Sequence, residues 1–274
     1  MFLKQKIQNN MSNLLSGKTG LIMGIANETS IAWHIANACK ANGAELCLTY
    51  PNQTMESRVT KLGQELGCQN LFECDVSSQE SIQKACDAIK QKYGKLDFIV
   101  HAVAFSDKNE LKGRYVDTSA ENFANTMNIS CYSLTAVTRH LAPIMKDGGS
   151  ILTLSYYGAE KAIPNYNVMG VAKAALETSV KYLALDLGVD GIRVNAISAG
   201  PIRTLAAAGI SDFRRMLNWS EKNTPLRRNV TGEDIGGAAV FLLSNASSGV
   251  TGEIMHVDCG YHAVGMKLED DKQD

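Results

Sequence analysis

Short apolar runs rich in Val, Ile and Leu alternate along the chain with stretches that have the period of a helix. The apolar runs span residues 19–24, 44–50, 70–76, 96–104, 149–155, 192–200 and 253–260. Strands that are apolar along their whole length are buried on both faces, which is typical of a parallel sheet covered by helices on each side. The pattern therefore predicts an α/β fold, in which one doubly wound domain contains a seven-stranded parallel sheet.

The helical period is clearest after the third apolar run. The apolar side chains there recur every three or four residues and fall on one stripe: Ile82, Ala85, Cys86, Ile89 and Tyr93. Such a helix can join two parallel strands by a right-handed crossover. Crossovers of this kind place the carboxyl ends of all strands on one edge of the sheet, where ligands bind in open α/β folds. We therefore expect the functional residues at that edge.

The length of 274 residues is close to the upper limit for one hydrophobic core, so we expect a single domain. Its predicted boundaries are residues 15–266, between an N-terminal extension over 1–14 and a polar C-terminal tail over 267–274. Residues 201–230 interrupt the alternation of strands and helices between the sixth strand and the last helix. Long connections of this kind are often lids, and we predict a substrate lid here.

Charge and composition exclude several classes of partner. The net charge of −1 argues against nucleic acid or a membrane surface as the main partner. No window approaches the roughly 18 apolar residues that a membrane span needs, and no secretory signal is expected in the first residues. The seven cysteines contain no Cys-x-x-Cys pair and most lie in apolar runs, as reduced core cysteines do, while the five histidines are scattered. We therefore expect a cytoplasmic protein without a metal site.

The first predicted strand runs into the segment GIANETSIAWHIA. Gly24 can adopt backbone conformations that other residues resist, and it allows a phosphate to approach the main chain. Ser30 then opens a helix whose free N–H groups and dipole favour an anion. The later glycine positions of the G-x-G-x-x-G fingerprint hold Ala26 and Thr29, so an ordinary turn between a strand and a helix stays an alternative. The segment is a candidate dinucleotide-binding loop.

The ends of the next three strands extend this candidate site. The second strand ends at Pro51 with neither an acid for a ribose 2′-hydroxyl nor an arginine for a 2′-phosphate, so it does not distinguish NADH from NADPH. Asp75 and Val76 end the third strand and could bind the adenine amino group and its ring; alternatively, Asp75 only caps the following helix. The fourth strand ends in HAVAF, where small Ala102 and Ala104 would let a dinucleotide lie against the backbone.

The fifth strand ends at Ser155 and Tyr156, and Pro164 precedes the next predicted helix. Within that helix Tyr166 and Lys173 are seven residues apart, close to two turns, so both project from one face. A nearby ammonium favours the phenolate form of a tyrosine, which suits a group that protonates or stabilises an oxygen made negative by hydride transfer. Lysine also donates to the hydroxyls of a nicotinamide ribose. The alternative is a helix with one buried ring and one solvated charge.

The chain resembles the short-chain dehydrogenase/reductases, and within them the NADH-dependent enoyl-[acyl-carrier-protein] reductases of bacterial-type fatty-acid synthesis. Typical members place the lysine four residues after the tyrosine, where this chain has Gly170. The spacing Tyr-x6-Lys, with Tyr156 ten residues upstream, is that of the enoyl reductases. Residues 154–173 and 193–210 match that family nearly letter for letter, and GIANETSIA and GEIMHVDCGY agree with it. The resemblance covers residues 15–266 and implies a Rossmann-like fold.

The resemblance implies a role for each matching residue. Tyr156 and Tyr166 are the active-site pair, with Tyr166 bonded to the thioester carbonyl, and Lys173 binds the nicotinamide ribose. The cofactor-binding positions are Gly24, Ser30, Ile31, Pro51, Asp75, Val76, Val103, Lys173, Ile202, Arg203, Thr204, Leu205 and Ala206. The substrate-binding positions are Ser106, Tyr156, Tyr166 and Met169. Two positions depart from the family: Pro51 stands where familiar members carry glutamine, and Ala104 where glycine is common.

The implied reaction is that of an oxidoreductase of fatty-acid biosynthesis. Hydride passes from NADH to C3 of a trans-2-enoyl thioester, negative charge accumulates on the thioester oxygen, and a proton reaches C2. Two alternatives stay open: a carbonyl or 3-ketoacyl thioester reductase on the same fold, and a non-catalytic dinucleotide-binding scaffold. The lysine spacing argues against the first, and the intact set of two tyrosines and a lysine argues against the second.

The expected partners follow from the same resemblance and from the predicted lid. Enoyl-acyl carrier protein is the implied substrate, and a homotetramer is implied, with residues 119–145 and 165–189 as contacts. The predicted lid contains six Lys and Arg residues against two acids, a local charge of +4. This charge could steer an acidic acyl carrier protein, or its arginines could pair internally. The small, apolar residues 204–210 are suited to closing over an acyl chain.

Overall fold

Seven parallel strands form one sheet in the centre of the molecule, in the order β3-β2-β1-β4-β5-β6-β7. The computed structural model describes residues 13–204 and 213–266. The strands are β1 (Thr19–Met23), β2 (Glu45–Tyr50), β3 (Leu71–Glu73), β4 (Phe98–His101), β5 (Gly149–Ser155), β6 (Ile192–Ala199) and β7 (Ile254–Val257). The predicted doubly wound α/β fold is confirmed. The third and fourth strands are shorter than their apolar runs.

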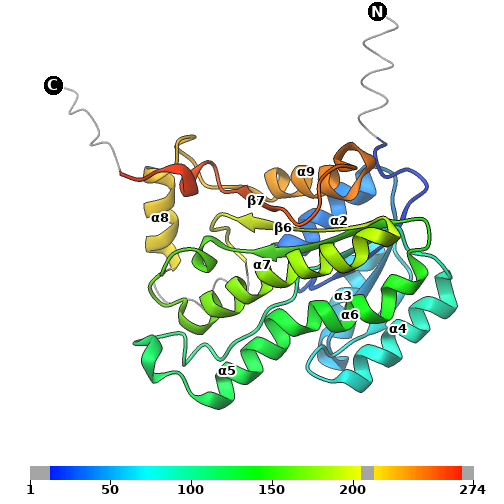
Figure 1. Ribbon diagram of the computed structural model, residues 1–274, viewed down its shortest axis with the longest axis horizontal. Coiled ribbons are helices and arrows are strands. Elements are labelled where there is room, and N and C mark those ends of the chain that lie inside the picture. Colours follow the sequence, from blue (N-terminus) through cyan, green and yellow to red (C-terminus); the bar gives the residue numbers. More distant parts are fainter. Residues whose placement is uncertain (1–12, 205–212, 267–274) are drawn as a thin grey trace, which may run out of the picture.

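Helices cover both faces of this sheet (Figure 1). The first face packs against α2 (Ile31–Ala41), α3 (Gln53–Glu65) and α9 (Gly232–Leu243). The second face packs against α4 (Gln79–Tyr93), α6 (Ser133–Leu141) and α7 (Asn167–Leu187). The remaining helices of the described chain are α5 (Ala120–Met127), which a π-helical turn over Asn128–Tyr132 joins to α6, and α8 (Phe213–Asn223).

The strands supply both hydrophobic cores because successive side chains point to opposite faces of a sheet. In β1, Ile22 enters the core under α2 and α9, while Leu21 and Met23 enter the core under α4 and α7. In β4, Phe98 lies in the first core and Ile99 in the second, and both are fully buried. Continuous apolar runs were therefore a sound predictor of strands buried on both sides.

The strand order reverses between β1 and β4, and this switch point determines where a ligand can bind. All seven strands run parallel, so their carboxyl ends share one edge.

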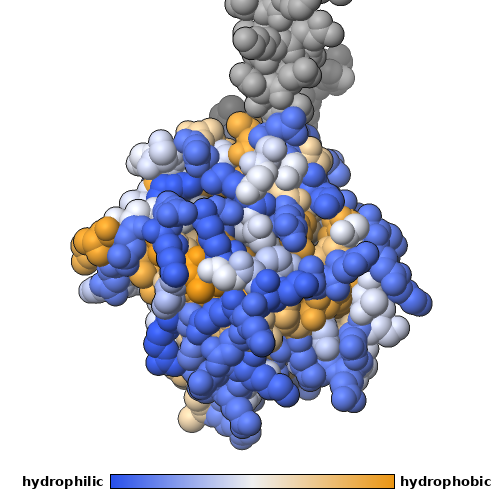
Figure 2. Space-filling model, turned by 90° about the vertical axis from the view of Figure 1, so that its right-hand side faces the viewer, coloured by the Kyte–Doolittle hydropathy of each residue, from blue (hydrophilic) through white to orange (hydrophobic). Residues whose placement is uncertain are grey.

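The helix α8 lies at the left-hand end of the molecule in Figure 1. The side at the right-hand end is mostly hydrophilic, with apolar residues in small patches (Figure 2).

Three predicted segments lie wholly or partly outside the described residues: most of the N-terminal extension, the C-terminal tail 267–274, and residues 205–212 of the predicted lid.

All seven cysteines are described, and each is buried and free, as expected for reduced core cysteines. Burial raises the pKa of the Cys39 thiol to about 12. None of the described helices is long and apolar enough to span a membrane.

Candidate active site

A cavity of about 380 Å³ opens at the carboxyl edge of the sheet, beside the switch point. Its walls come from the ends of β4, β5 and β6, the first turns of α2 and α7, and α8. It brings together these predicted site residues: Ile31, Val103, Ser106, Tyr156, Tyr166, Met169, Lys173, Ile202 and Thr204. Most of the cavity surface is apolar, so a buried donor or charge in it is poorly screened by water.

Two tyrosines stand together on one wall of this cavity. Tyr156 directly follows β5, and Tyr166 directly precedes α7. Their ring centroids are 4.9 Å apart with an interplanar angle of 71°, an edge-to-face contact. Gly158 makes room for this pair, since a Cβ at that position would lie 2.5 Å from the Tyr166 ring. The predicted active-site pair is therefore assembled by the fold.

Tyr166 lies outside the regular helix in which the sequence placed it. The helix α7 begins at Asn167, and Tyr166 occupies the position before it. Asn165 and Asn167 have φ angles of 62° and 39°, in the left-handed region that asparagine tolerates better than most residues. This turn replaces the first helical turn, yet Tyr166 and Lys173 still line the same cavity.

Gly170 shows why the lysine cannot stand four residues after the tyrosine. A Cβ at position 170 would lie 2.7 Å from the carbonyl oxygen of Gly158. Such a contact is shorter than real Cβ atoms make, and its partner is backbone that cannot move aside. The close packing of Gly170 on Gly158 is the same packing that seats the Tyr166 ring. The lysine therefore stands one turn later in α7, at position 173.

Lys173 is buried, with only 6% of its surface exposed. Its Nζ donates to the carbonyl oxygen of Leu154, at 2.7 Å, near the end of β5. Burial lowers the pKa of Lys173 to about 8, and the neighbouring Cys131 thiol and Glu177 carboxylate oppose that shift. An ammonium has three donors, so this bond leaves capacity for an acceptor in the cavity.

Burial governs the tyrosine hydroxyls as well. It raises the pKa of Tyr166, and the neighbouring Tyr156 hydroxyl and Glu177 carboxylate raise it further. It also raises the pKa of Tyr156. The expectation that the lysine charge would favour the Tyr166 phenolate is therefore wrong, because removal from water disfavours the charged form and has the largest effect on this pKa. Both tyrosines are neutral phenols, which can donate a hydrogen bond.

The turn after β1 fits a dinucleotide diphosphate. Gly24 has a φ angle of +97°, and a Cβ there would overlap the carbonyl oxygen of Ala102 at the end of β4. The Ser30 hydroxyl accepts from the N–H groups of Ala26 and Asn27, at 3.0 and 2.9 Å, and makes no cap bond to its own helix. The first N–H groups of α2 therefore receive no acceptor from the Ser30 side chain. A backbone cradle beside a helix N-terminus is a suitable anion site.

The ends of β2 and β3 lie further along the same edge. The N-cap of α4 is Ser78, which accepts from the N–H of Ser81. Asp75 is exposed, and its carboxylate accepts from both the N–H and the hydroxyl of Ser77. The alternative that Asp75 only caps α4 is therefore wrong. Its role in binding adenine stays a prediction. The cofactor-binding roles of Pro51 and of buried Val76 stay predictions as well. Arg203 is exposed, and Leu205 and Ala206 lie outside the described residues.

Ser106 belongs to a polar network that the sequence did not reveal. Its Oγ accepts from the hydroxyl of Thr126 at 2.9 Å and from Nδ2 of Asn122 at 3.2 Å. Asn122 Oδ1 accepts from the N–H of Asp107 at 3.1 Å. Asn122 and Thr126 are buried in α5, and they are 16 and 20 residues from Ser106 in sequence but adjacent to it in space. The network holds the wall that follows β4.

Several other cavity residues were missed: Phe105, Lys108, Leu111, Phe213 and Met216. Phe105 is the last residue of HAVAF, and Lys108 and Leu111 follow it; their position after a strand end was the available signal. Phe213 and Met216 come from α8 in the predicted lid, so this part of the predicted lid does border the cavity.

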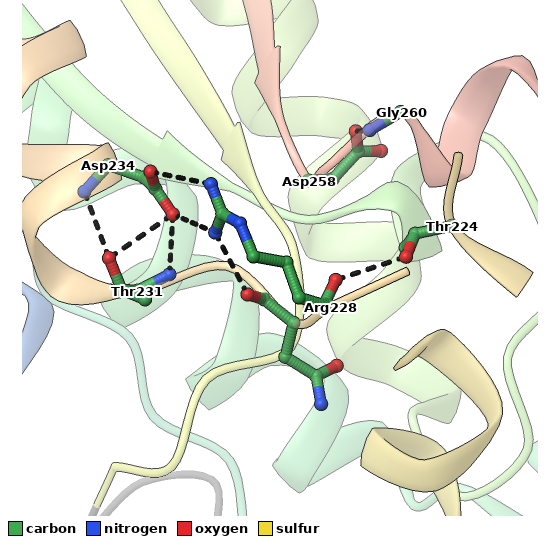
Figure 3. Close-up of polar contacts among 7 residues, drawn as sticks. Thr224, Arg228, Thr231, Asp234, Asp258 and Gly260 are labelled. Atoms are coloured by element: carbon green, nitrogen blue, oxygen red, sulfur yellow. Dashed lines mark hydrogen bonds and ion pairs between the residues drawn. The ribbon is translucent and has the colours of Figure 1, made fainter. Parts of the chain in front are cut away.

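The described end of the predicted lid is anchored to α9 (Figure 3). Arg228 forms an ion pair with Asp234, and Thr224 Oγ1 donates to the carbonyl oxygen of Arg228. Thr231 and Asp234 form a capping box at the start of α9. The hydrogen bond from Arg228 lowers the pKa of Asp234 to about 2. Arg228 therefore pairs with an acid of the same protein, as one of the two alternatives for the arginines of the predicted lid expected. Arg214 and Arg215, by contrast, are exposed on α8.

Comparison with known proteins gives one consistent family. The family model described as "Enoyl-(Acyl carrier protein) reductase" matches residues 24–262. Enoyl-[acyl-carrier-protein] reductase [NADH] 1 of Rhizobium meliloti is 60% identical over 259 residues, which cover 94% of this chain and 95% of the relative. Enoyl-[acyl-carrier-protein] reductase [NADH] FabI of Rickettsia felis is 60% identical over 254 residues, 93% of this chain and 98% of the relative.

Solved structures agree with these sequence matches. The crystal structure of the reductase from Anaplasma phagocytophilum in complex with NAD has a TM-score of 0.90 and 58% identity, covering 94% of this chain and 97% of the other. The enoyl-[acyl-carrier-protein] reductase (NADH) of Aquifex aeolicus has a TM-score of 0.91 and 48% identity, covering 93% of this chain and 100% of the other.

Replacement of Gly24 tests the cradle after β1. We expect Gly24→Ala to lower the free energy of unfolding by about 2 kcal/mol or more, and to weaken dinucleotide binding at least about tenfold, because the new Cβ meets the Ala102 backbone. Urea unfolding and a fluorescence titration measure the two effects. Gly94→Ala is the control, since Gly94 also has a positive φ but nothing lies within 4 Å of its Cβ position. Unchanged dinucleotide affinity in Gly24→Ala would contradict the assignment.

Proposed function

The chain belongs to the NADH-dependent enoyl-[acyl-carrier-protein] reductase family, and on this basis we propose that Tyr156, Tyr166 and Lys173 perform its reaction in the cavity beside the switch point. The protein is an oxidoreductase that uses NADH to reduce the C2=C3 double bond of trans-2-enoyl-[acyl-carrier-protein] in type II fatty-acid synthesis. One observation supports the residue assignment most strongly: two neutral phenols and a buried lysine line one apolar cavity.

Lys173 orients the cofactor in this proposal. Its remaining donors would bind the hydroxyls of the nicotinamide ribose, while the bond to the Leu154 carbonyl holds the side chain in place. Charge-assisted hydrogen bonds of this kind are roughly twice as strong as neutral ones. When bound, NADH supplies the hydride that adds to C3 of the substrate.

Tyr166 acts on the substrate oxygen. As a neutral phenol it donates a hydrogen bond to the thioester carbonyl, whose oxygen gains negative charge when hydride reaches C3. A donor fixed in an apolar site stabilises such a charge more than water does, because no reorganisation is needed. Tyr156 packs on the Tyr166 ring edge to face and thereby fixes its direction. Met169 and Ser106 would bound the space for the enoyl group.

The cofactor lies along the carboxyl edge in this proposal. Gly24, Ser30 and Ile31 would contact the diphosphate, and Asp75 and Val76 the adenine. Val103 and the stretch after β6, including Ile202 and Thr204, would border the nicotinamide. These placements follow the parallel sheet, since every one of these residues comes from a strand end or from the first turn after it.

Acyl carrier protein, self-association and location complete the proposal. Carrier-linked enoyl chains are the substrates, and exposed Arg214 and Arg215 on α8 would steer the acidic carrier.

A homotetramer would use the helices within 119–145 and 165–189; exposed Tyr182 and Leu185 on α7 support such contacts. A cytoplasmic location is supported by seven free, buried cysteines.

Substrate preference is the direct test of the function. With NADH, we expect the purified protein to consume crotonyl thioester and to leave acetoacetyl thioester unreduced, because Tyr166 and Lys173 are placed for charge on a conjugated thioester oxygen. Loss of NADH absorbance measures both rates, and product analysis identifies the saturated thioester. Faster consumption of acetoacetyl thioester would instead indicate a carbonyl reductase.

Two substitutions separate the proposed roles of the tyrosine and the lysine. Removing one oxyanion donor typically costs about 3 kcal/mol. We expect Tyr166→Phe to lower kcat by less than this, about tenfold to a hundredfold, because the conjugated substrate is already activated, with NADH affinity unchanged. We expect Lys173→Met, which keeps the side-chain volume, to weaken NADH binding. Full NADH affinity in Lys173→Met would refute the ribose assignment.

Charge reversal on α8 tests the carrier-docking surface. We expect Arg214→Glu combined with Arg215→Glu to lower kcat/KM for carrier-linked substrate about tenfold, because like charges repel the acidic carrier. A small thioester should be reduced at the normal rate. Lys84→Glu with Lys92→Glu is the control, since both residues are exposed on α4. Equal losses with both substrates would show that α8 serves the cavity and not the carrier.

A further inference from the structure

Two neighbouring residues of β5 bind two residues that lie one turn apart on α7. The carbonyl oxygen of Leu154 accepts from Lys173 Nζ at 2.7 Å. The hydroxyl of Ser155 donates to Glu177 Oε1 at 2.5 Å. The next residue in the chain is Tyr156 of the active-site pair. Glu177 is half-buried and lies at i+4 from Lys173, so both side chains project from the same side of α7 toward the end of β5.

The surroundings of Lys173 contain few groups that can balance its charge. Among the described groups, Glu177 is the carboxylate whose negative charge favours the ammonium, and the other group that favours it is the Cys131 thiol. His101 of β4 is fully buried, and burial lowers its pKa to about 3, so it is neutral and adds no charge. A buried ammonium without a nearby negative charge tends to lose its proton.

Glu177 in turn has neighbours on β5, α7 and β7 and on the segment after β5. Ser155 binds it from β5, Lys181 faces it from the next turn of α7, and Glu160 and His256 face it from the segment after β5 and from β7. Glu160 is itself bound to His256 Nε2 at 2.7 Å. Burial raises the pKa of Glu177, while the Ser155 bond, His256 and Lys181 lower it.

We propose that Glu177 is a positioning residue for the reduction: its carboxylate, held by Ser155, is the counter-charge that keeps Lys173 protonated for binding the nicotinamide ribose. This inference rests on the proposed role of Lys173. Glu177 acts through the lysine and does not line the cavity. Its charge also disfavours the Tyr166 phenolate, so one carboxylate supports the protonated form of both groups.

The pH dependence of NADH binding distinguishes this role from a purely structural one. Burial lowers the pKa of Lys173 to about 8, so its charge is present at lower pH and is lost as pH rises through that value. In the wild-type protein NADH affinity should therefore fall as pH rises past about 8. Loss of the Glu177 charge should move this fall to lower pH, because the ammonium is then less favoured.

The experiment compares wild type, Glu177→Gln, Glu177→Asp and Asp186→Asn. Glutamine keeps an oxygen that can accept from Ser155 but has no charge. Asp186 is exposed near the far end of α7 and serves as the control for loss of one carboxylate from this helix. Fluorescence titration gives the Kd of NADH at each pH from about 6 to about 9, a range that brackets the lowered lysine pKa. Circular dichroism confirms that each variant is folded.

The proposal expects Glu177→Gln to match wild type near pH 6 and to bind NADH about three- to tenfold more weakly near pH 8, with its fall displaced by about one pH unit. Glu177→Asp should lie closer to wild type, and Asp186→Asn should overlay it. If Glu177→Gln does not fold, Glu177→Asp and Ser155→Ala remain, and both should displace the curve in the same direction by less.

Two outcomes would overturn the proposal. A Glu177→Gln curve that overlays wild type shows that the carboxylate does not support the lysine charge. A loss of affinity that is equal at every pH shows that Glu177 only holds α7 against β5. If instead the proposed role of Lys173 itself is wrong, the Lys173→Met variant will bind NADH as well as wild type does. This result distinguishes an error in the proposed function from an error in the role of Glu177.

Discussion

A lysine ammonium held almost wholly out of water is the interaction on which this active site depends. Lys173 lines the cavity, bound to a β5 carbonyl, and burial brings its pKa down to about 8. The same exclusion of water keeps Tyr156 and Tyr166 protonated. Donors in such a place meet a developing negative charge without competition from solvent. The chemistry thus follows from burial more than from any direct contact between the tyrosine and the lysine.

Close backbone packing creates the space for these side chains. Gly170 of α7 lies against the carbonyl of Gly158, so a Cβ on Gly170 would collide with that carbonyl and a Cβ on Gly158 would collide with the Tyr166 ring. Gly24 approaches the β4 end in the same way at the cofactor side. Each contact joins the end of one strand to an element that is remote in sequence, so the positions of the functional groups depend on the whole sheet.

Much of this could be predicted from the sequence. Continuous apolar runs indicated all seven parallel strands, and the resemblance to the enoyl reductases indicated Tyr166 and Lys173, which line one cavity. Interactions between distant segments could not be predicted. The network from Ser106 to Thr126 and the bond from Ser155 to Glu177 require tertiary packing that no local pattern encodes. The direction of the Tyr166 pKa shift was wrong for the same reason, since spacing shows a neighbouring charge but not burial.

The central claim is that a phenol and a lysine converge on the reacting end of a dinucleotide at the carboxyl edge of the sheet. A crystal structure of the protein with NAD and an unreactive enoyl thioester analogue measures this most directly. We expect ribose hydroxyls within hydrogen-bonding distance of Lys173 Nζ and the thioester oxygen within that distance of the Tyr166 hydroxyl. A nicotinamide that lies away from Lys173, or a thioester oxygen bound by another group, would contradict it.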